Sequence, residues 1–193
     1  MPRPAVKEGP QDTREAILKV AGNLLQTRGY NGFSYAHVAQ ALNVKTAAIH
    51  YHFPAKTDLG LAVVERYRER YRRWMKDAQS LPAWEQLDGY FRIFEYFLSG
   101  NKTCPAGVLQ AEYQAIPEEL RAQTRDVERE VHAWLTQVLE QGRAHGAFVF
   151  TGEPSDKARL IGAGVQGALQ VARPMGKDAF HAVLRALRAD LGR

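Results

Sequence analysis

The chain has 193 residues, a formal net charge of +5 and a pI of about 9.4. This length can bury a real core, in one domain or two small ones, and the basic balance makes nucleic acid or an anionic surface a candidate partner. A single cysteine excludes an intrachain disulfide and a zinc site built on several cysteines, and it fits a reducing cytoplasm.

Residues 1–10 open the chain with three prolines and one glycine, and they predict a flexible basic arm. They lack the apolar stretch of a signal peptide, and no later run of about 18 apolar residues predicts a membrane span. We therefore expect a cytoplasmic protein. The first long helix begins near Asp12, where a capping-box pattern precedes an apolar stripe, and Gly29 ends it.

The next stretch, residues 33–59, predicts two short helices, a tight turn and the start of a longer helix. Ser34 is a good N-cap for the first helix, because its hydroxyl can accept a hydrogen bond from a free backbone amide. Asn43 tolerates the left-handed conformation that ends a helix, and Pro54 ends the second one. Two short helices joined in this way match the helix-turn-helix plan, whose second helix enters the DNA major groove.

The second of these helices presents hydrogen-bond donors on its outer side. No aspartate or glutamate occurs between Ala16 and Thr57, which suits approach to a polyanion. The alternative is a helical hairpin that only packs, and the donor-rich face argues against it. The side chains that we expect to be exposed are Lys45, Thr46, His50, Tyr51 and His52.

The run from Val44 to Leu59 resembles the N-terminal DNA-binding domain of TetR-family transcriptional regulators, with Ile49, Tyr51, His52, Phe53, Lys56 and Leu59 in place. The resemblance implies that Ser34, Tyr51, His52 and Lys56 hold phosphates and that Thr46, Ala47 and His50 face base edges, with Lys45 able to reach either. Lys45, Thr46, Ala47 and His50 all depart from the residues common in the family, so the operator sequence does not carry over from a relative.

The rest of the chain also predicts helices, for a total of about nine and no sheet. We expect an all-α protein with a DNA-binding head at residues 11–55 and an effector-binding and dimerisation body at residues 56–193. The expected body helices cover residues 56–79, 84–98, 105–115, 117–142, 155–171 and 177–191, with a short extended piece at 148–150.

The middle helices of the body are rich in aromatic residues. Aromatics at helical spacing usually form plain core, yet a cavity lined by a few of them would suit a small apolar or aromatic effector. In the resembled family such a ligand swings the helix that corresponds to residues 56–79 and releases the operator. The candidate cavity residues are Tyr71, Trp74, Tyr90, Phe94, Phe97, Cys104, Tyr113 and Trp134.

Cys104 precedes Pro105 at a predicted helix N-terminus and follows Lys102. The partial positive charge of that terminus and the lysine would lower the pKa of the thiol, and electrophile-sensing TetR-like repressors carry a cysteine in a similar setting. The alternative is a buried cysteine without chemistry, which is common.

The run Gly162–Gly167 matches the G-x-G-x-x-G dinucleotide fingerprint, but a helical segment precedes it where the fingerprint needs a strand. We read the small residues as a close helix contact, so that the last two helices pair with their copies in a homodimer; the alternative is that these faces close the core of one subunit. The candidate interface residues are Ile161, Val165, Ala168, Leu169, Phe180, Val183, Leu184 and Leu187.

These patterns together predict a DNA-binding repressor that binds a palindromic operator as a homodimer and is released by a small-molecule effector, with electrophiles as one candidate class. The alternative is a helical enzyme or a ligand-binding module without DNA binding. The sequence lacks the common hydrolase, zinc-protease and P-loop motifs, so we expect no enzyme activity, no metal site and no cofactor.

Overall fold

The computed structural model describes residues 10–192, and within that range it contains only helices, turns and loops. This confirms the predicted all-α class. The helices are α1 (Pro10–Arg28), α2 (Tyr35–Leu42), α3 (Thr46–His52), α4 (Lys56–Ala78), α5 (Ala83–Ser99), α6 (Pro105–Ala111), α7 (Glu118–Ala144), α8 (Pro154–Met175) and α9 (Lys177–Ala189), with a 3₁₀ turn at Tyr113–Ala115.

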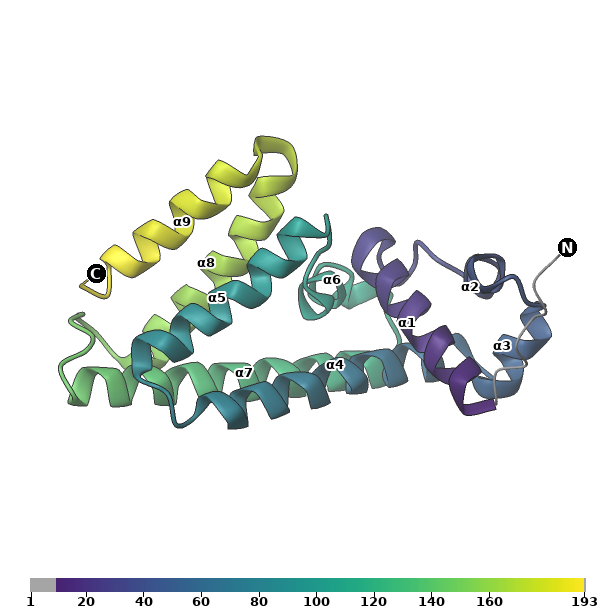
Figure 1. Ribbon diagram of the computed structural model, residues 1–193, viewed down its shortest axis with the longest axis horizontal. Helices are drawn as coiled ribbons and strands as arrows, with labels where there is room; N and C mark the ends of the chain where they lie inside the picture. The colour runs from purple at the N-terminus through teal and green to yellow at the C-terminus, as the bar shows by residue number, and fades with distance from the viewer. Residues whose placement is uncertain (1–9, 193) are drawn as a thin grey trace, which may run out of the picture.

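The helices α1, α2 and α3 gather at one end of an elongated molecule (Figure 1). Their core is apolar and dense, because Ile17 of α1, Val38 of α2 and Ile49 of α3 are all fully buried. The expected N-terminal arm lies outside the described residues, apart from Pro10, which begins α1. This small core fixes the position of α3 relative to α1.

The connection between α2 and α3 follows the predicted caps. At the start of α2 the backbone N–H of Ser34 donates to the Nδ1 atom of His37 at 3.0 Å. At its end Asn43 has a φ of 54°, and its N–H bonds back to the last turn. The left-handed residue reverses the chain, so that α3 begins three residues later, at Thr46.

The body is built around two long helices that lie alongside each other, α4 and α7; α5 rises obliquely away from them, and α8 and α9 lie above them in the view (Figure 1). The pair α8 and α9 has the most extensive contact in the fold. Arg68 and Arg72 of α4 both donate to the carboxylate of Glu130 in α7, which ties the two long helices together. The N-terminal part of α4 continues into the head, so α4 belongs to both ends of the molecule.

The ends of several helices differ from the sequence prediction, most of all in α6 and α8. Helix α6 ends at Ala111, and a 3₁₀ turn at Tyr113–Ala115 carries the chain to Pro117. Helix α8 continues to Met175, because Pro174 falls in its last turn, where the missing N–H costs one bond only. Residues 148–150, expected as a short extended piece, form a loop in which the N–H of Val149 donates to Leu191 O at 3.1 Å.

Within residues 10–192 no helix is both long and apolar enough to cross a membrane.

Candidate nucleic-acid interface and effector cavity

The outer side of α3 carries the side chains that the sequence placed there. Lys45, Thr46, Ala47 and His50 are exposed, whereas Ile49 is buried in the core of the head. Tyr51 is 78% exposed, whereas most tyrosines in folded proteins are at least partly buried. His52 is half-buried beside it, with the two rings 5.0 Å apart. The helix therefore presents a polar, aromatic face to solvent.

The base of α3 is fixed by hydrogen bonds that the sequence analysis missed. The hydroxyl of Tyr35 in α2 donates to Phe53 O at 2.6 Å, and burial raises the pKa of Tyr35 to about 12, so the proton stays on the hydroxyl. The Nδ1 atom of His50 lies 3.3 Å from Pro54 O. A carbonyl can only accept, so Nδ1 carries the proton and Nε2 remains available to a ligand.

Two other predicted phosphate contacts lie in different settings. Ser34 is exposed at the start of α2. The ammonium of Lys56, by contrast, packs over the rings of Tyr30 and Phe33, at 4.5 and 4.9 Å from their centroids. Partial burial there lowers the pKa of Lys56. Lys56 thus packs on the aromatic residues of the head and is only partly exposed.

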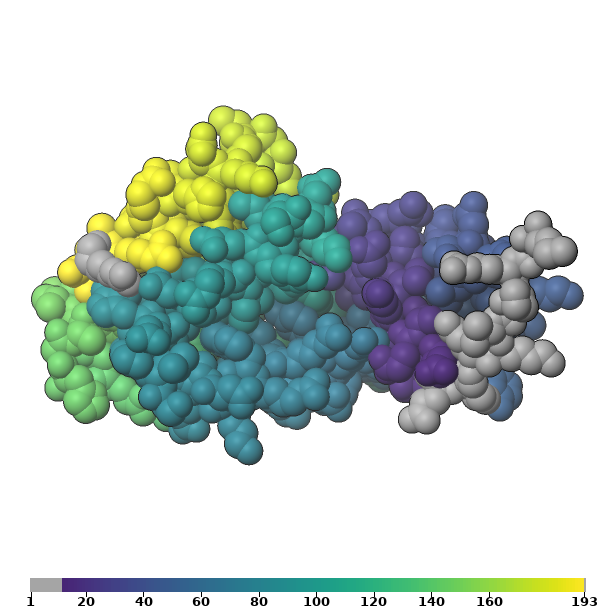
Figure 2. Space-filling view, in the orientation of Figure 1, coloured from purple at the N-terminus to yellow at the C-terminus, as the bar shows by residue number. Residues whose placement is uncertain are grey.

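Besides the packing of α1 on α4 and α6, two hydrogen-bonded pairs of residues join the head to the body. The N–H of Thr103 donates to Gln26 O at 3.0 Å, and Gln26 Nε2 donates to Thr103 O at 3.1 Å. The carboxylate of Glu112 accepts from the backbone N–H and from Nδ2 of Asn31, both at 3.0 Å. Figure 2 shows α1 at the boundary between the two ends of the molecule. We call these two pairs the head–body joint.

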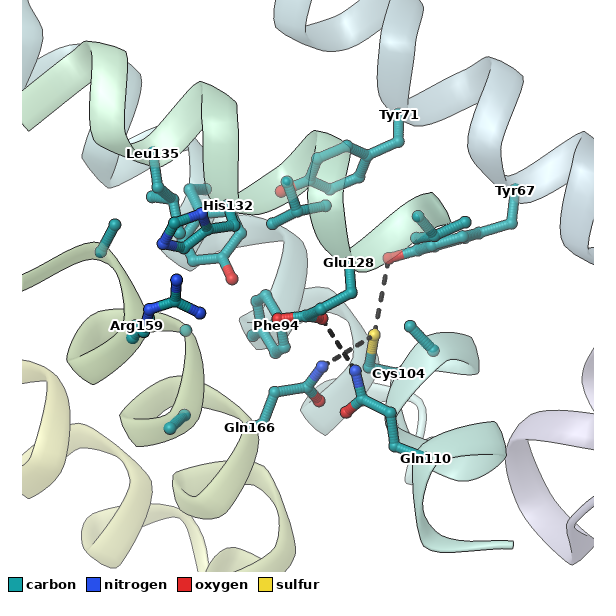
Figure 3. Close-up of a pocket in the computed structure, with 17 residues that line it drawn as sticks. Tyr67, Tyr71, Phe94, Cys104, Gln110, Glu128, His132, Leu135, Arg159 and Gln166 are labelled. Atoms are coloured by element: carbon teal, nitrogen blue, oxygen red, sulfur yellow. Dashed lines mark hydrogen bonds between the residues drawn. The ribbon is translucent and has the colours of Figure 1, made fainter. Parts of the chain in front are cut away.

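A cavity of about 390 Å³ lies in the body among α4, α5, α6, α7 and α8 (Figure 3). Its inner wall is aromatic and aliphatic, and its outer rim is polar. Four of the eight predicted cavity residues line it, namely Tyr71, Tyr90, Phe94 and Cys104. The lining residues that the aromatic pattern did not identify include Tyr67, Gln110, Glu128, His132, Leu135, Arg159 and Gln166. Polar rim residues of this kind give no periodic signal in a sequence.

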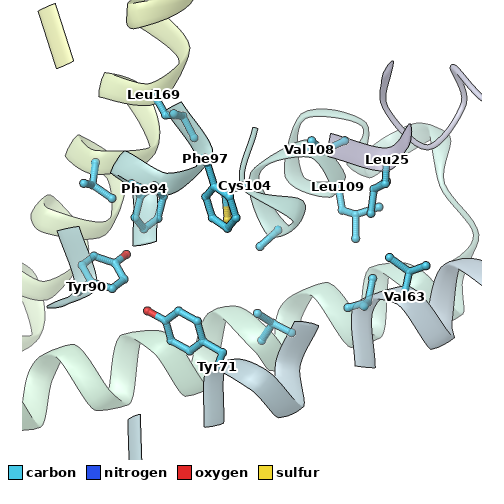
Figure 4. Close-up of a cluster of buried hydrophobic side chains, with 14 of the residues drawn as sticks. Leu25, Val63, Tyr71, Tyr90, Phe94, Phe97, Cys104, Val108, Leu109 and Leu169 are labelled. Atoms are coloured by element: carbon cyan, nitrogen blue, oxygen red, sulfur yellow. The ribbon is translucent and has the colours of Figure 1, made fainter. Parts of the chain in front are cut away.

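The other four predicted residues lie outside the cavity. Trp74 and Trp134 meet edge to face with centroids 5.0 Å apart, and Trp134 faces a separate hollow of about 360 Å³. Phe97 is buried behind the cavity wall beside Phe94 and Cys104 (Figure 4). Tyr113 lies in the 3₁₀ turn, where its hydroxyl accepts from Arg125 at 2.6 Å. Helical spacing predicts that a residue faces the protein interior, but it does not predict which part of the interior that residue contacts.

Cys104 is buried at the inner end of the cavity, with Sγ 3.5 Å from the Tyr67 hydroxyl and 3.7 Å from Gln166 Nε2. Burial raises the pKa of the thiol, and hydrogen bonds from Tyr67 and from the amides of Gly107 and Ala106 offset only part of that effect. The expected lowering is therefore wrong in sign: the amides of the helix N-terminus act as predicted, but desolvation is larger. In this conformation the group is a neutral thiol.

The predicted dimer residues also require a correction. Seven of the eight are buried within a single chain, with exposures between 0% for Phe180 and 8% for Leu187. Only Val183 is partly exposed. The alternative stated above therefore holds for the other seven, Ile161, Val165, Ala168, Leu169, Phe180, Leu184 and Leu187, which close the core of one subunit between α8, α9 and the helices beneath them.

The G-x-G-x-x-G run lies wholly inside α8, and no strand precedes it, so the geometry of a dinucleotide site is missing from this segment. Gly164 allows Leu187 of α9 to approach, because an added Cβ would lie 3.3 Å from that side chain. Gly162 and Gly167 face open space. Only one of the three glycines thus serves a close helix contact within the chain.

The fold and the exposed face of α3 define a helix-turn-helix DNA-binding protein, and comparison with known proteins agrees. Residues 17–63 match the family model described as bacterial regulatory proteins, tetR family. A TetR-family transcriptional regulator from Agrobacterium tumefaciens superposes with a TM-score of 0.89 at 33% identity, over 95% of this chain and 99% of that one. A TetR regulator from Legionella pneumophila gives 0.85 at 30% identity, over 96% and 100%.

Among named relatives, the transcriptional repressor NemR of Escherichia coli K12 is 26% identical over 163 residues, which cover 80% of this chain and 81% of NemR. The chain belongs to the TetR family of transcriptional regulators, and it is a DNA-binding regulator.

Proposed function

We propose that the protein is a repressor that binds a palindromic operator as a homodimer and leaves it when a small molecule enters the cavity. The observation that supports this most strongly is the short path between the two sites. Cys104 lines the cavity, and its neighbour Thr103 is hydrogen-bonded to Gln26 in the head. We propose repression and not activation because the relative NemR is named a repressor.

We assign DNA roles from exposure and chemistry. Tyr51, His52 and Ser34 contact phosphates and set the register of α3, while Thr46, Ala47 and His50 face base edges. Lys45, at the N-cap of α3, reaches either. Because Lys56 packs on Tyr30 and Phe33, it contributes to the head core in this conformation, and its phosphate contact stays a prediction.

The unit boundaries proposed for these roles are residues 11–55 for DNA binding and residues 56–193 for effector binding and dimerisation. The dimer face is the outer side of α8 and α9, which one chain leaves uncovered. Leu160 and Val171 are 51% and 48% exposed, and Met175 is 71% exposed. The adjoining exposed positions are small and permit close helix approach: Gly167, Ala182, Ala186 and Ala189. A second copy that packs there would bury this apolar surface around a two-fold axis.

The effector acts by preferring a conformation in which the heads no longer match the operator spacing. A molecule in the cavity contacts α4, through Tyr67 and Tyr71, and the segment that carries Cys104. Movement of either element reaches the head, since α4 enters it and Thr103 is bonded to it. An electrophilic effector would react at Cys104, and its burial means that the thiol must first become exposed or deprotonated.

A fluorescence anisotropy titration tests the DNA-binding roles. With a duplex that carries an inverted repeat from beside the gene, we expect Lys45→Ala to lower affinity for all sequences and to reduce the salt slope by about one per half-site. His50→Ala should relax preference at one base step per half-site, at a cost of about 1–3 kcal/mol. Equal operator binding by both variants and the unsubstituted protein would refute the assignment.

Gel filtration with light scattering tests the dimer face. Val171→Arg places a charge in the proposed interface and should give monomers at concentrations where the unsubstituted chain is dimeric. The matched control is Tyr96→Arg, since Tyr96 is 67% exposed on α5 and lies outside α8 and α9. A dimer that survives Val171→Arg would exclude this face.

A further inference from the structure

We propose that the cavity ligand is an aromatic acid bound as its anion, with an oxygen-bearing ring held against Tyr71 and its carboxylate at the rim beside Arg159. This inference rests on the proposed function, because it names the chemical class of the effector for the same cavity. It depends on three features of the cavity: an unpaired hydroxyl inside, an aromatic wall around it, and an unpaired cation at the opening.

The inner wall contains a polar group without a partner. The hydroxyl of Tyr71 is buried and makes no hydrogen bond to any residue within 10–192. Leaving a buried hydroxyl unsatisfied costs about 1–3 kcal/mol, so a cavity-facing one is expected to have a partner in the bound state. Burial raises the pKa of Tyr71 well above its ordinary value, so the group keeps its proton and donates. Its natural complement is a ligand oxygen.

The wall around this hydroxyl selects a flat ring. Tyr71 and Tyr90 meet edge to face, with centroids 6.4 Å apart, and Phe94 lies 5.2 Å from Tyr90. Figure 3 shows Tyr67 and Tyr71 on one side and Phe94 on the other. A cavity of about 390 Å³ lies at the small end of the range for ligand sites, about 300–1,000 Å³. It therefore suits one or two fused rings better than a long or branched molecule.

The rim supplies the charge. The guanidinium of Arg159 lines the opening from α8, and it has neither an ion pair nor a hydrogen bond within the described part of the chain. The one carboxylate among the lining residues, Glu128 of α7, already accepts from Gln110 at 2.8 Å. His132 is also engaged, because its Nε2 lies 3.0 Å from Ser155 O. Glu128 keeps its negative charge, so a ligand carboxylate is placed at Arg159, the arginine of the lining without an ion pair among the described residues, which it fits bidentately.

Calorimetric titration of the full chain without DNA tests the proposal. The probes are 4-hydroxybenzoate and 6-hydroxy-2-naphthoate, each compared with its amide and with the acid that lacks the hydroxyl. We expect the better-fitting hydroxy acid to bind about tenfold more tightly than its amide, because only the acid forms a charge-assisted pair with Arg159. The acid without the hydroxyl should bind more weakly, since it leaves Tyr71 unpaired.

Variants separate the two contacts. Arg159→Gln should abolish the preference for acid over amide, whereas Tyr71→Phe should abolish the preference for the hydroxylated acid and leave the acid–amide ratio unchanged. Arg129→Gln is the matched control, because Arg129 is exposed on α7 and pairs with Asp126, outside the cavity lining. It should change neither ratio.

The proposal is overturned if the amides bind as tightly as the acids, if Arg159→Gln leaves the ratio intact, or if neither acid binds. An uncharged compound that binds and releases the operator would reject the ligand class and keep the proposed function. Tight binding of an acid without any effect on operator affinity would keep the ligand class and reject the proposed function of the cavity.

Discussion

Gln26 in α1 and Thr103 in the loop before α6 exchange two hydrogen bonds, one from the Thr103 amide to Gln26 O at 3.0 Å and one from Gln26 Nε2 to Thr103 O at 3.1 Å. Arg173 of α8 also donates to the Thr103 hydroxyl at 3.0 Å. Thr103 is thus bonded to the head and to the body, and the next residue lines the cavity. A ligand that displaces Cys104 would pull on the head through a single peptide unit.

The side-chain half of this link can be removed on its own. Gln26→Ala keeps the bond from the Thr103 amide, which uses the backbone carbonyl of residue 26. We expect unchanged ligand affinity in the absence of DNA and a loss of about 1 kcal/mol, or roughly fivefold, in the ratio of operator affinities without and with ligand. The control is Asn23→Ala, an exposed amide on the same helix. A coupling ratio that Gln26→Ala does not alter would show that the side-chain bond from Gln26 to Thr103 does not carry the signal.

Gly29 bears on the second pair of the head–body joint. It has a φ of +86°, and an added Cβ would lie 2.0 Å from Oε1 of Glu112. Gly29→Ala must therefore push the carboxylate away from Asn31. Gly146 has a φ of +71° and open space around it. Gly146→Ala therefore strains the backbone in the same way but displaces no neighbouring side chain.

We expect Gly29→Ala to lower the free energy of unfolding by at least about 1 kcal/mol more than Gly146→Ala, as measured by urea denaturation. In a Glu112→Ala background this excess should vanish, because no carboxylate remains to be displaced. Equal costs for the two alanine substitutions in the unsubstituted background would contradict this account of the joint.

Glu130 gives the protein a defined response to acid. The guanidinium groups of Arg68 and Arg72 lower the pKa of its carboxyl to about 2. A lowered pKa in the folded state contributes stability above the unfolded value near 4.5, and that contribution is lost as the pH falls toward about 2. Glu130→Gln should therefore cost about 1–3 kcal/mol at neutral pH, and the cost should shrink below pH 4.5.

Chemical denaturation at several pH values would measure this difference. Glu140→Gln serves as the control, since Glu140 is exposed on the same helix and forms no ion pair within the described residues. A cost for Glu130→Gln that stays constant from pH 7 to pH 3 would show that the pairs with Arg68 and Arg72 do not stabilise the fold.

The burial of Cys104 predicts slow chemistry at neutral pH. Because its pKa is raised above the ordinary value near 9, the thiolate fraction at pH 7 is small. We expect iodoacetamide to alkylate the native protein at least about tenfold more slowly than the urea-unfolded protein at pH 7, with a rate that climbs as the pH passes 9. Rapid labelling of the native protein at neutral pH would instead support a poised, reactive thiol.

The same residue separates the two kinds of effector. Cys104→Ser should preserve operator release by a ligand that binds without a covalent bond. If release by a quinone or an aldehyde also survives Cys104→Ser, electrophile sensing at this position is ruled out.

The sequence predicted the head in detail because local rules decide it. Ser34, Asn43 and Pro54 begin or end helices through contacts with residues only a few positions away in the chain. The run without aspartate or glutamate lacks negative side chains however its helices are arranged. The body helices were predicted with errors of a few residues at their ends. Their apolar stripes specify that they pack, so the all-α class followed.

Two parts of the site could not be predicted from periodicity. A buried stripe has the same pattern whether it faces its own chain or a partner, and for this reason Ile161 and Phe180 were placed in a dimer interface when they close one subunit. The cavity lies where five helices converge, so its rim residues Glu128 and Arg159 come together only in three dimensions. The head–body joint is likewise made of contacts between residues about 80 positions apart.

The central claim is that α3 reads duplex DNA as half of a symmetric pair and that the cavity controls it. DNase footprinting of the purified chain on the DNA flanking its own gene tests this most directly. We predict protection of two inverted half-sites, with centres one helical turn of about 34 Å or a multiple of it apart, and loss of that protection when a cavity ligand is added. Protection of a single half-site, or none even at low salt, would contradict the account.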